Sequence, residues 1–384
     1  MVKAGDMVYA RATDSAIRQH GQSGGAVTAT LKYLLENAVV DGVLAMGRGT
    51  DVYDGVPRLI TDPTSTTELS GSLYCAPIIQ SHVLCKYLNG AQDMKLAVVG
   101  VGCDSLAMQV QIRKGELNAD NLVRIGLNCG GTFQPVRAQD MIRTLYDTDP
   151  MAVVNADISK GKLIIETRDH ERKEYKLDDL EALGYGRRAN CRRCEEKIPR
   201  TMDLACGTWG VIGPDVSSWT FVEVCSSAGA QLLDDAVAAG ALAVKDPIPR
   251  GIEIRANIEK AMLKLAAKWQ DHDFLTGDER DEFWLKQFAK CIKCGGCWKA
   301  CPVCTCDDCK LESCEPRWVE GGLPPSPKLQ YTRAAHMDAD CVNCGQCEDA
   351  CPVEIPLSSF FHQSTKNTAK LLARFDELIS ARKA

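Results

Sequence analysis

The spacing of apolar residues predicts alternating helices and strands over roughly the first 250 residues of the chain. Helical spacing of apolar positions over residues 25–38 predicts a helix, and the compact apolar run at 39–46 predicts a buried strand. Further strands are predicted at 95–101, 122–127 and 219–225, and further helices at 106–113 and 231–239. We therefore expect an α/β fold built on a mixed sheet.

A hairpin and two long helices complete this pattern. Residues 162–167 and 172–177 flank a polar turn at 169–170, which is typical of a hairpin. Two amphipathic helices are predicted at about 254–270 and 279–289. The predicted parts of the chain are an α/β domain at 1–250, a helical connector at 251–289, a ferredoxin-like domain at 290–360 and a C-terminal helix at 361–384.

Two runs of the form Cys-x2-Cys-x2-Cys-x3-Cys-Pro dominate the C-terminal part. The first run contains Cys291, Cys294, Cys297 and Cys301, and the second contains Cys341, Cys344, Cys347 and Cys351. A cubane [4Fe–4S] cluster needs four thiolates, and this spacing is that of bacterial two-cluster ferredoxins. Zinc is the weaker interpretation, because structural zinc sites usually use paired Cys or His. A Pro- and Gly-rich connector at 320–328 separates the runs.

The assignment of the ligands follows the crossover of such ferredoxins, in which the fourth cysteine of each run binds the other cluster. One cluster is accordingly assigned to Cys291, Cys294, Cys297 and Cys351. The other is assigned to Cys341, Cys344, Cys347 and Cys301. The sequence therefore predicts a protein that transfers electrons.

Composition and charge narrow the class of protein further. Of 384 residues, 45% are hydrophobic and 25% charged, as in ordinary globular proteins. The start has no apolar signal core, and no apolar run is long enough to cross a bilayer. Twenty cysteines without an export signal favour metal ligation in a reducing cytoplasm over disulfides. The net charge of −6 disfavours nucleic-acid binding.

A separate group of cysteines lies in the α/β part. Cys191 and Cys194 form an isolated Cys-x2-Cys pair, Cys206 follows, and Cys129 lies at the predicted end of a strand. These four thiols are candidates for one more [4Fe–4S] cluster, with Cys103 as the alternative fourth ligand. The other interpretation is that Cys129 and Cys206 are buried small apolar residues. The remaining cysteines are interpreted as packing residues: Cys75, Cys85 and Cys225.

Basic residues surround the Cys191–Cys194 pair. They are Arg187, Arg188, Arg192, Arg193, Lys197 and Arg200. Such a run usually marks a solvated face. It could equally offset thiolate charge or attract an anionic cofactor, so both interpretations stay open.

Two glycine-bearing turns are candidates for cofactor binding. The turn at 21–28 opens a predicted helix, where glycine lets a phosphate approach the backbone and the helix start favours its charge. The turn at 100–104 connects a strand to a helix. The residues assigned to cofactor binding are Ser23, Gly24, Gly25, Thr28, Gly100 and Gly102. The alternative is a simple helix cap, because neither turn is a Gly-x-Gly-x-x-Gly or Walker motif.

Four C-terminal cysteines are left over by the ferredoxin pattern: Cys304, Cys306, Cys309 and Cys314. Their number fits one further metal site, and [4Fe–4S] is preferred to zinc. A ligand role is favoured because free thiols beside clusters are readily oxidised. Otherwise they pack as small buried residues. The chain is thus expected to hold three or four clusters.

Several motifs, in this order and spacing, resemble those of the coenzyme F420 hydrogenase/dehydrogenase β-subunit family. They lie at 23–28, 99–103, 126–129, 191–194 and 203–207, so that the resemblance covers about residues 15–250. It implies an FAD- and F420-binding domain with one [4Fe–4S] cluster and with F420 as substrate. The C-terminal double-cluster extension resembles that of methanogen formate dehydrogenase β subunits. The chain departs from the family at Gly102, often Pro, and at Cys225–Ser226, where Arg-Thr is expected.

The resemblance implies an F420-reducing electron-transfer subunit. Clusters pass single electrons and the deazaflavin F420 exchanges hydride, so FAD would connect the two, with no catalytic side chain assigned. Nothing resembles a molybdenum or tungsten pterin domain, so formate oxidation would belong to a catalytic α subunit. Heterodisulfide reductase subunits are a further expected partner. The alternatives are a β subunit of an F420-linked hydrogenase complex and a flavin-free iron–sulfur adaptor.

Overall fold

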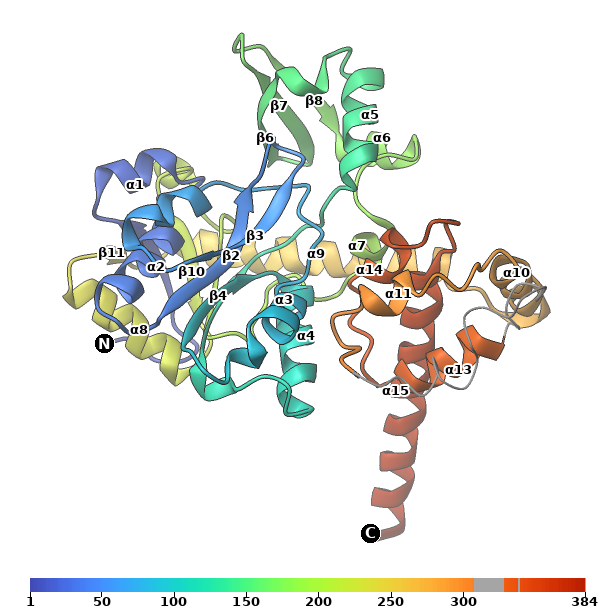
Figure 1. Cartoon of the computed structure of the whole chain (residues 1–384). Coiled ribbons are helices and arrows are strands. Elements are labelled where there is room, and N and C mark those ends of the chain that lie inside the picture. The colour runs from blue at the N-terminus through green and yellow to red at the C-terminus, as the bar shows by residue number, and fades with distance from the viewer. Residues whose placement is uncertain (307–327, 338, 384) are drawn as a thin grey trace. The chain divides into compact units, whose positions relative to one another are not determined.

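The computed structural model of the chain describes residues 1–306, 328–337 and 339–383. These residues form two compact units (Figure 1). The first unit comprises Met1–Arg188 and Glu195–Lys264, and the second comprises Ala189–Cys194 and Leu265–Ala384. The second unit is therefore discontinuous in sequence, since a six-residue segment that contains Cys191 and Cys194 belongs to it.

The first unit contains an eight-stranded sheet (Figure 1), and its mixed strand directions agree with the prediction of a mixed sheet. Its order is β11-β1-β10-β9-β5-β4-β2-β3. Neighbours among β9, β5, β4 and β2 run parallel, and the other pairs run antiparallel. The strands are β1 (Met7–Ala12), β2 (Gly42–Arg48), β3 (Gly55–Ile60), β4 (Leu96–Gly100), β5 (Leu122–Leu127), β9 (Leu204–Gly207), β10 (Thr220–Val224) and β11 (Leu242–Lys245).

Two of the central strands, β4 and β10, are buried along their whole length. Every residue of β4 and of β10 is buried, as expected for strands covered on both faces. Strand β5 begins and ends at the predicted residues, whereas β2 begins three residues after its predicted start. The reason is the end of the preceding helix, where Ala38 adopts a φ of 51° and Val39 N–H donates to Leu34 O.

The helices of the first unit are α1 (Ser15–His20), α2 (Ala26–Glu36), α3 (Gln80–Tyr87), α4 (Gly102–Arg113), α5 (Pro135–Leu145), α6 (Leu177–Ala182) and α8 (Ser227–Ala238). Helix α8 begins four residues before its predicted start. The cause is its cap, because Ser226 Oγ accepts a hydrogen bond from Gly229 N–H at 3.0 Å. Helix α9 (Pro249–Asp273) contains the boundary between the two units.

A smaller three-stranded sheet belongs to the same unit. It consists of β6 (Val153–Ser159), β7 (Lys162–Thr167) and β8 (Arg172–Lys176), and the predicted hairpin is its β7–β8 part. Leu163 and Ile165 of β7 pack in one buried cluster with residues of α5 and α6, which lie beside this sheet in Figure 1. The hairpin thus packs into an apolar cluster that also includes Val52, Tyr53 and Cys75.

The second unit is helical. It contains α7 (Ala189–Arg193), α10 (Gly277–Phe288), α11 (Gly296–Lys299), α13 (Lys328–Met337), α14 (Gln346–Asp349) and α15 (Leu357–Lys383). Aromatic rings join three of these helices: the Phe360 ring of α15 lies 4.9 Å from Trp284 and from Phe288 of α10, and 5.4 Å from Tyr331 of α13. Among the described residues, no helix is long and apolar enough to span a membrane.

Candidate functional site

The two C-terminal cysteine loops have the same backbone conformation, fifty residues apart. Lys293 and Asn343 have φ values of 55° and 52°, and the glycines two residues later have φ values of 77° and 78°. Each glycine precedes a four-residue helix, α11 or α14. Non-glycine residues rarely adopt positive φ, so its occurrence at both equivalent positions shows that the loops are a structural repeat.

Hydrogen bonds follow the same repeat. Ala300 N–H donates to Gly296 O, and Ala350 N–H donates to Gln346 O, each at 3.0 Å. The fourth cysteine of each run accepts an equivalent bond, from Cys304 N–H to Cys301 O at 3.2 Å and from Glu354 N–H to Cys351 O at 3.1 Å. Each loop therefore presents its four thiols from the same scaffold.

A pocket in the second unit gathers thiols from both runs. It is lined by Cys301 of the first run and by Cys341, Cys344 and Cys347 of the second. Burial raises the pKa of Cys347 well above its usual value, and the charges of the thiols that share the pocket raise it further against the lowering effect of Arg333. Ionising these thiols together therefore requires a compensating cation, which the iron of a cluster would supply.

The other set of assigned ligands also lies together. Burial raises the pKa of Cys297, Arg333 acts to lower it, and the charges of Cys291, Cys294 and Cys351 act to raise it. Cys351 belongs to the second run, so this neighbourhood has the crossed arrangement as well. Among the described residues, no group of three His, Cys, Asp or Glu side chains is arranged around a single metal ion. Of the four left-over cysteines, Cys304 and Cys306 are described, whereas Cys309 and Cys314 lie outside the described residues.

The segment that carries Cys191 and Cys194 is held against the second cysteine loop. Asn190 Nδ2–H donates to Asn343 O at 3.1 Å, and Asn343 Nδ2–H donates back to Asn190 O at 2.9 Å. Both side chains are buried. Since Asn190 precedes Cys191 and Asn343 precedes Cys344, this reciprocal pair connects two loops that carry predicted cluster ligands.

Further contacts of α7 fix its orientation within the second unit. Arg193 is 1% exposed, forms an ion pair with Asp273 and donates from Nη2 to Ser358 Oγ at 2.6 Å. The guanidinium of Arg192 lies 4.3 Å from the ring centroid of Trp269. Ser358 also lines the thiol pocket, so Arg193 is tied to the wall of that pocket.

The reciprocal asparagine pair leads to a testable expectation about stability. Asn343→Gly removes the side-chain bond to Asn190 O while keeping a residue that tolerates positive φ, so we expect a loss of about 1–3 kcal/mol. The equivalent change in the first loop, Lys293→Gly, removes no such bond and is expected to be neutral or slightly stabilising. Denaturant unfolding of the intact chain measures both. Equal effects of the two changes would show that the pair does not stabilise the segment.

The other two assigned ligands of the N-terminal cluster belong to the first unit. Cys129 N–H donates to Lys197 O at 3.0 Å, and Asn128 N–H donates to Cys206 O at 2.8 Å, so that the loop after β5 is bonded to β9. Cys206 is 3% exposed within the apolar core of this unit, and burial raises its pKa to about 12. This environment is also the one expected of a small packing residue. Cys75 lies in a buried apolar cluster in the same way.

The basic run beside these cysteines is mostly buried. Arg187, Arg188, Arg193 and Lys197 are each less than 9% exposed. The interpretation as a solvated face is therefore wrong for these four residues. Arg187 forms a buried pair with Glu181, from Nε to Oε1 at 2.5 Å and from Nη2 to Oε2 at 3.1 Å.

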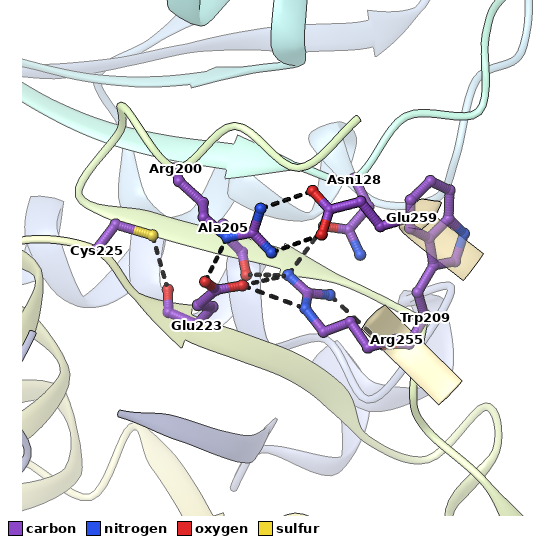
Figure 2. A network of polar contacts seen from close by, with 8 residues as sticks. All are labelled: Asn128, Arg200, Ala205, Trp209, Glu223, Cys225, Arg255 and Glu259. Atoms are coloured by element: carbon purple, nitrogen blue, oxygen red, sulfur yellow. Dashed lines mark hydrogen bonds and ion pairs between the residues drawn. The ribbon is translucent and has the colours of Figure 1, made fainter. Parts of the chain in front are cut away.

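A polar network supports the cysteine-bearing segments of the first unit (Figure 2). Arg255 of α9 is 1% exposed and donates from Nε and Nη2 to Glu223 Oε2, each at 3.3 Å. The same Nη2 group donates to Asn128 Oδ1 at 3.3 Å and to Ala205 O at 3.4 Å. Arg200 binds the other oxygen of Glu223 and also Glu259. Because Asn128 and Ala205 immediately precede Cys129 and Cys206, the network fixes the backbone at both cysteines.

The glycines of the two candidate turns are required by contacts of the chain with itself. Gly24 and Gly25 both have a φ of 69°, and a Cβ on Gly24 would lie 2.5 Å from Ser218 O. Ser23 Oγ–H donates to Trp219 O, and Thr28 Oγ1 is 3.3 Å from Ser70 Oγ. Helix α2 nevertheless begins with no side chain capping its first amide groups, which leaves a helix start suited to an anion.

The second turn is filled by its own chain in the same way. A Cβ on Gly100 would lie 2.6 Å from Cβ of Asp104, and one on Gly102 would collide with Glu196 O. Asp104 accepts hydrogen bonds from Gln80 N–H at 2.6 Å and Val101 N–H at 2.9 Å, and burial raises its pKa to about 6. These contacts explain the glycines without a ligand.

Comparisons with known proteins agree with the family resemblance. Residues 7–84 match the N-terminal part, and residues 93–250 the C-terminal part, of the family described as "Coenzyme F420 hydrogenase/dehydrogenase, beta subunit". The F420-dependent formate dehydrogenase 1 subunit beta of Methanococcus maripaludis is 47% identical over 373 residues, 96% of this chain and 94% of the relative. The F420-dependent formate dehydrogenase subunit beta of Methanocaldococcus jannaschii is 45% identical over 359 residues, 93% and 92% of the two chains.

More distant relatives share part of the chain. The coenzyme F420 hydrogenase subunit beta of Methanothermobacter thermautotrophicus is 26% identical over 279 residues, 68% of this chain and 94% of the relative. A chain in a solved structure of the F420-reducing [NiFe] hydrogenase complex from Methanosarcina barkeri has a TM-score of 0.63 at 21% identity. The matched region covers 73% of this chain and 97% of the hydrogenase chain, which shows that the two proteins share a fold.

Proposed function

Because the chain belongs to the coenzyme F420 hydrogenase/dehydrogenase β-subunit family, we propose that it is the F420-reducing subunit of a formate dehydrogenase. Two relatives at 45–47% identity are named as β subunits of F420-dependent formate dehydrogenases and match more than nine tenths of the chain. The match with the first covers 96% of the chain, so both cysteine runs lie within it. The hydrogenase relative covers 68% of the chain, which makes a hydrogenase subunit the second choice.

The observation that carries the electron-transfer part is the pocket in which thiols of both runs meet. Cys301 lines it together with Cys341, Cys344 and Cys347, and the charge of Cys351 acts on Cys297 of the first run, as do those of Cys291 and Cys294. Buried thiols are the donor set that iron–sulfur clusters require, so the residues fit two [4Fe–4S] clusters with crossed fourth ligands. The Asn190–Asn343 bonds join the α7 segment to the second cysteine loop, and this supports a route in which the cluster at Cys191 and Cys194 comes after the C-terminal clusters.

The N-terminal cluster and the flavin complete the proposal. Cys191, Cys194, Cys129 and Cys206 would hold the third cluster, with Cys103 as the alternative to Cys206. The start of α2 would take the flavin phosphate. When bound, FAD would convert between single electrons from the clusters and the hydride that F420 accepts. A catalytic α subunit would supply the electrons from formate. Onward transfer to a heterodisulfide reductase stays a prediction.

The crossed ligand assignment can be tested by iron content and by electron paramagnetic resonance (EPR) of the intact, anaerobically purified chain. The wild type is expected to contain about twelve irons and one flavin. Cys301→Ser and Cys344→Ser should remove the same cluster signal, whereas Cys351→Ser and Cys294→Ser should remove the other. Cys85→Ala, at a half-buried packing position, serves as the control.

Two outcomes would contradict this assignment. If Cys344→Ser and Cys351→Ser removed the same signal, each run would hold its own cluster. If the wild-type chain bound no iron, the proposed function itself would fail. A chain with clusters but without flavin would favour the adaptor function.

A further inference from the structure

Arg333 is a buried cation with no carboxylate partner among the described residues. It lies on α13 and is 4% exposed. Unlike Arg193, Arg255 and Lys286, it forms no ion pair with a described carboxylate. Nη2–H donates to the backbone carbonyl of Cys297 at 2.9 Å, and the guanidinium lies 4.9 Å from the ring centroid of Phe361. Burying a charge in this way is costly unless an anion lies nearby.

One end of the same guanidinium is unsatisfied. Nη1 is buried and has no hydrogen-bond partner in the described structure. Arg333 lines the pocket formed by Cys301, Cys341, Cys344 and Cys347, so its free donor belongs to the site of the second cluster. Its bonded end, at Cys297, belongs to the site of the first. A single side chain thus serves both predicted cluster sites.

The charge of Arg333 is retained in this environment. An arginine guanidinium does not lose its proton in the pH range in which proteins are folded. Arg333 therefore supplies a fixed positive charge that contacts the first cysteine loop at Cys297 O and lines the pocket of the second.

We propose that Arg333 is a shared positioning residue for the two C-terminal clusters, which balances their negative charge and raises their reduction potentials. The inference rests on the proposed function, since it requires both clusters. Each cluster takes up one electron and no proton on reduction, so its negative charge increases by one. A nearby fixed positive charge stabilises the reduced form more than the oxidised form, and a hydrogen bond to a cluster sulfur acts in the same direction.

Three substitutions in the full-length chain separate charge from hydrogen bonding. Arg333→Met removes both, Arg333→Gln keeps an N–H donor without charge, and Arg333→Lys keeps the charge. Midpoint potentials are measured by EPR-monitored anaerobic titration, with iron content determined on the same samples. Lys290→Met, which removes an exposed cation next to Cys291, is the matched control, because water screens a surface charge.

Arg333→Met is expected to lower both potentials. For the cluster in the pocket, the reduction equilibrium should change at least tenfold, about 59 mV for a one-electron couple. Arg333→Lys should stay close to the wild type, and Lys290→Met should show the smallest shift. If Arg333→Met does not load iron, the comparison of Arg333→Gln with Arg333→Lys gives the same test.

Unshifted potentials in an iron-loaded Arg333→Met or Arg333→Gln chain would overturn the role of Arg333. So would a shift in Arg333→Lys as large as in the neutral variants, because the charge would then be irrelevant. A wild-type chain without about eight irons assignable to the two runs would instead contradict the proposed clusters, and iron content of the wild type distinguishes this failure from the others.

Discussion

Replacing Cys191 with serine is expected to reduce formate-driven F420 reduction by the assembled enzyme to background. In the proposed route, the cluster held by Cys191 and Cys194 lies between the C-terminal clusters and the flavin. The reciprocal bonds of Asn190 and Asn343 place the Cys191 segment beside the second cysteine loop. Without this ligand the route is interrupted, because single electrons have no cluster through which to reach the flavin.

The assay distinguishes this loss from a general failure of the enzyme. Formate oxidation by the α subunit is followed with a viologen acceptor that takes electrons before the interruption, and it should continue at the wild-type rate. Flavin content should also be unchanged. Cys85→Ala is the matched control and should retain F420 reduction. A Cys191→Ser enzyme that reduces F420 at the wild-type rate would remove the N-terminal cluster from the route.

Replacing Glu223 with glutamine is expected to cause the largest loss of stability, about 3–5 kcal/mol, because it leaves the buried charge of Arg255 without its anion. Arg255 is 1% exposed and Glu223 7% exposed, and the other partners of Arg255 are neutral: Asn128, Ala205 and Trp209. Figure 2 shows how these groups surround the guanidinium. Guanidinium unfolding of the intact chain measures the effect.

Two further variants make this test specific. Glu253→Gln breaks an exposed pair with Arg250, whose side chains are 62% and 67% exposed, and should change stability by less than about 1 kcal/mol. The double change Glu223→Gln with Arg255→Met removes both charges and should recover part of the loss. A loss for Glu223→Gln no larger than that for Glu253→Gln would show that Arg255 is neutralised by other means.

The strands that could be predicted are those whose own residues carry the signal. The apolar run of β4 is recognisable locally because every residue of this strand is buried. Strand β5 is only half buried, but its own apolar and β-branched residues still indicate a strand. Strand β9 has four residues and β11 four, which is too short for a periodic pattern. These segments form strands because they pair with neighbouring strands, and such pairing cannot be recognised from the local sequence.

The candidate site divides in the same way. The two cysteine runs could be recognised because three proposed ligands of each cluster lie within seven residues, and the proposed crossover is the one found in two-cluster ferredoxins. Arg333 and the Asn190–Asn343 pair were not foreseen, because each acts on a loop far away in sequence. The one local signal was Asn343 itself, since asparagine tolerates the positive φ that its loop requires. The burial of Arg187 and Lys197 was also missed, because the residues that pair with them lie elsewhere in the sequence.

The discontinuity of the second unit has a consequence for how the protein is made. Asn190 and Asn343 are 153 residues apart, so at about 5–20 residues per second Asn190 is synthesised roughly 8–30 s before its partner. The strands of the first unit are complete once Lys245 has emerged, so its sheet can form during this interval. The bonds that hold the Cys191–Cys194 segment to the second cysteine loop, in contrast, can form only after Asn343 has been synthesised. We therefore expect iron insertion at this pair to be a late, post-translational step of biogenesis.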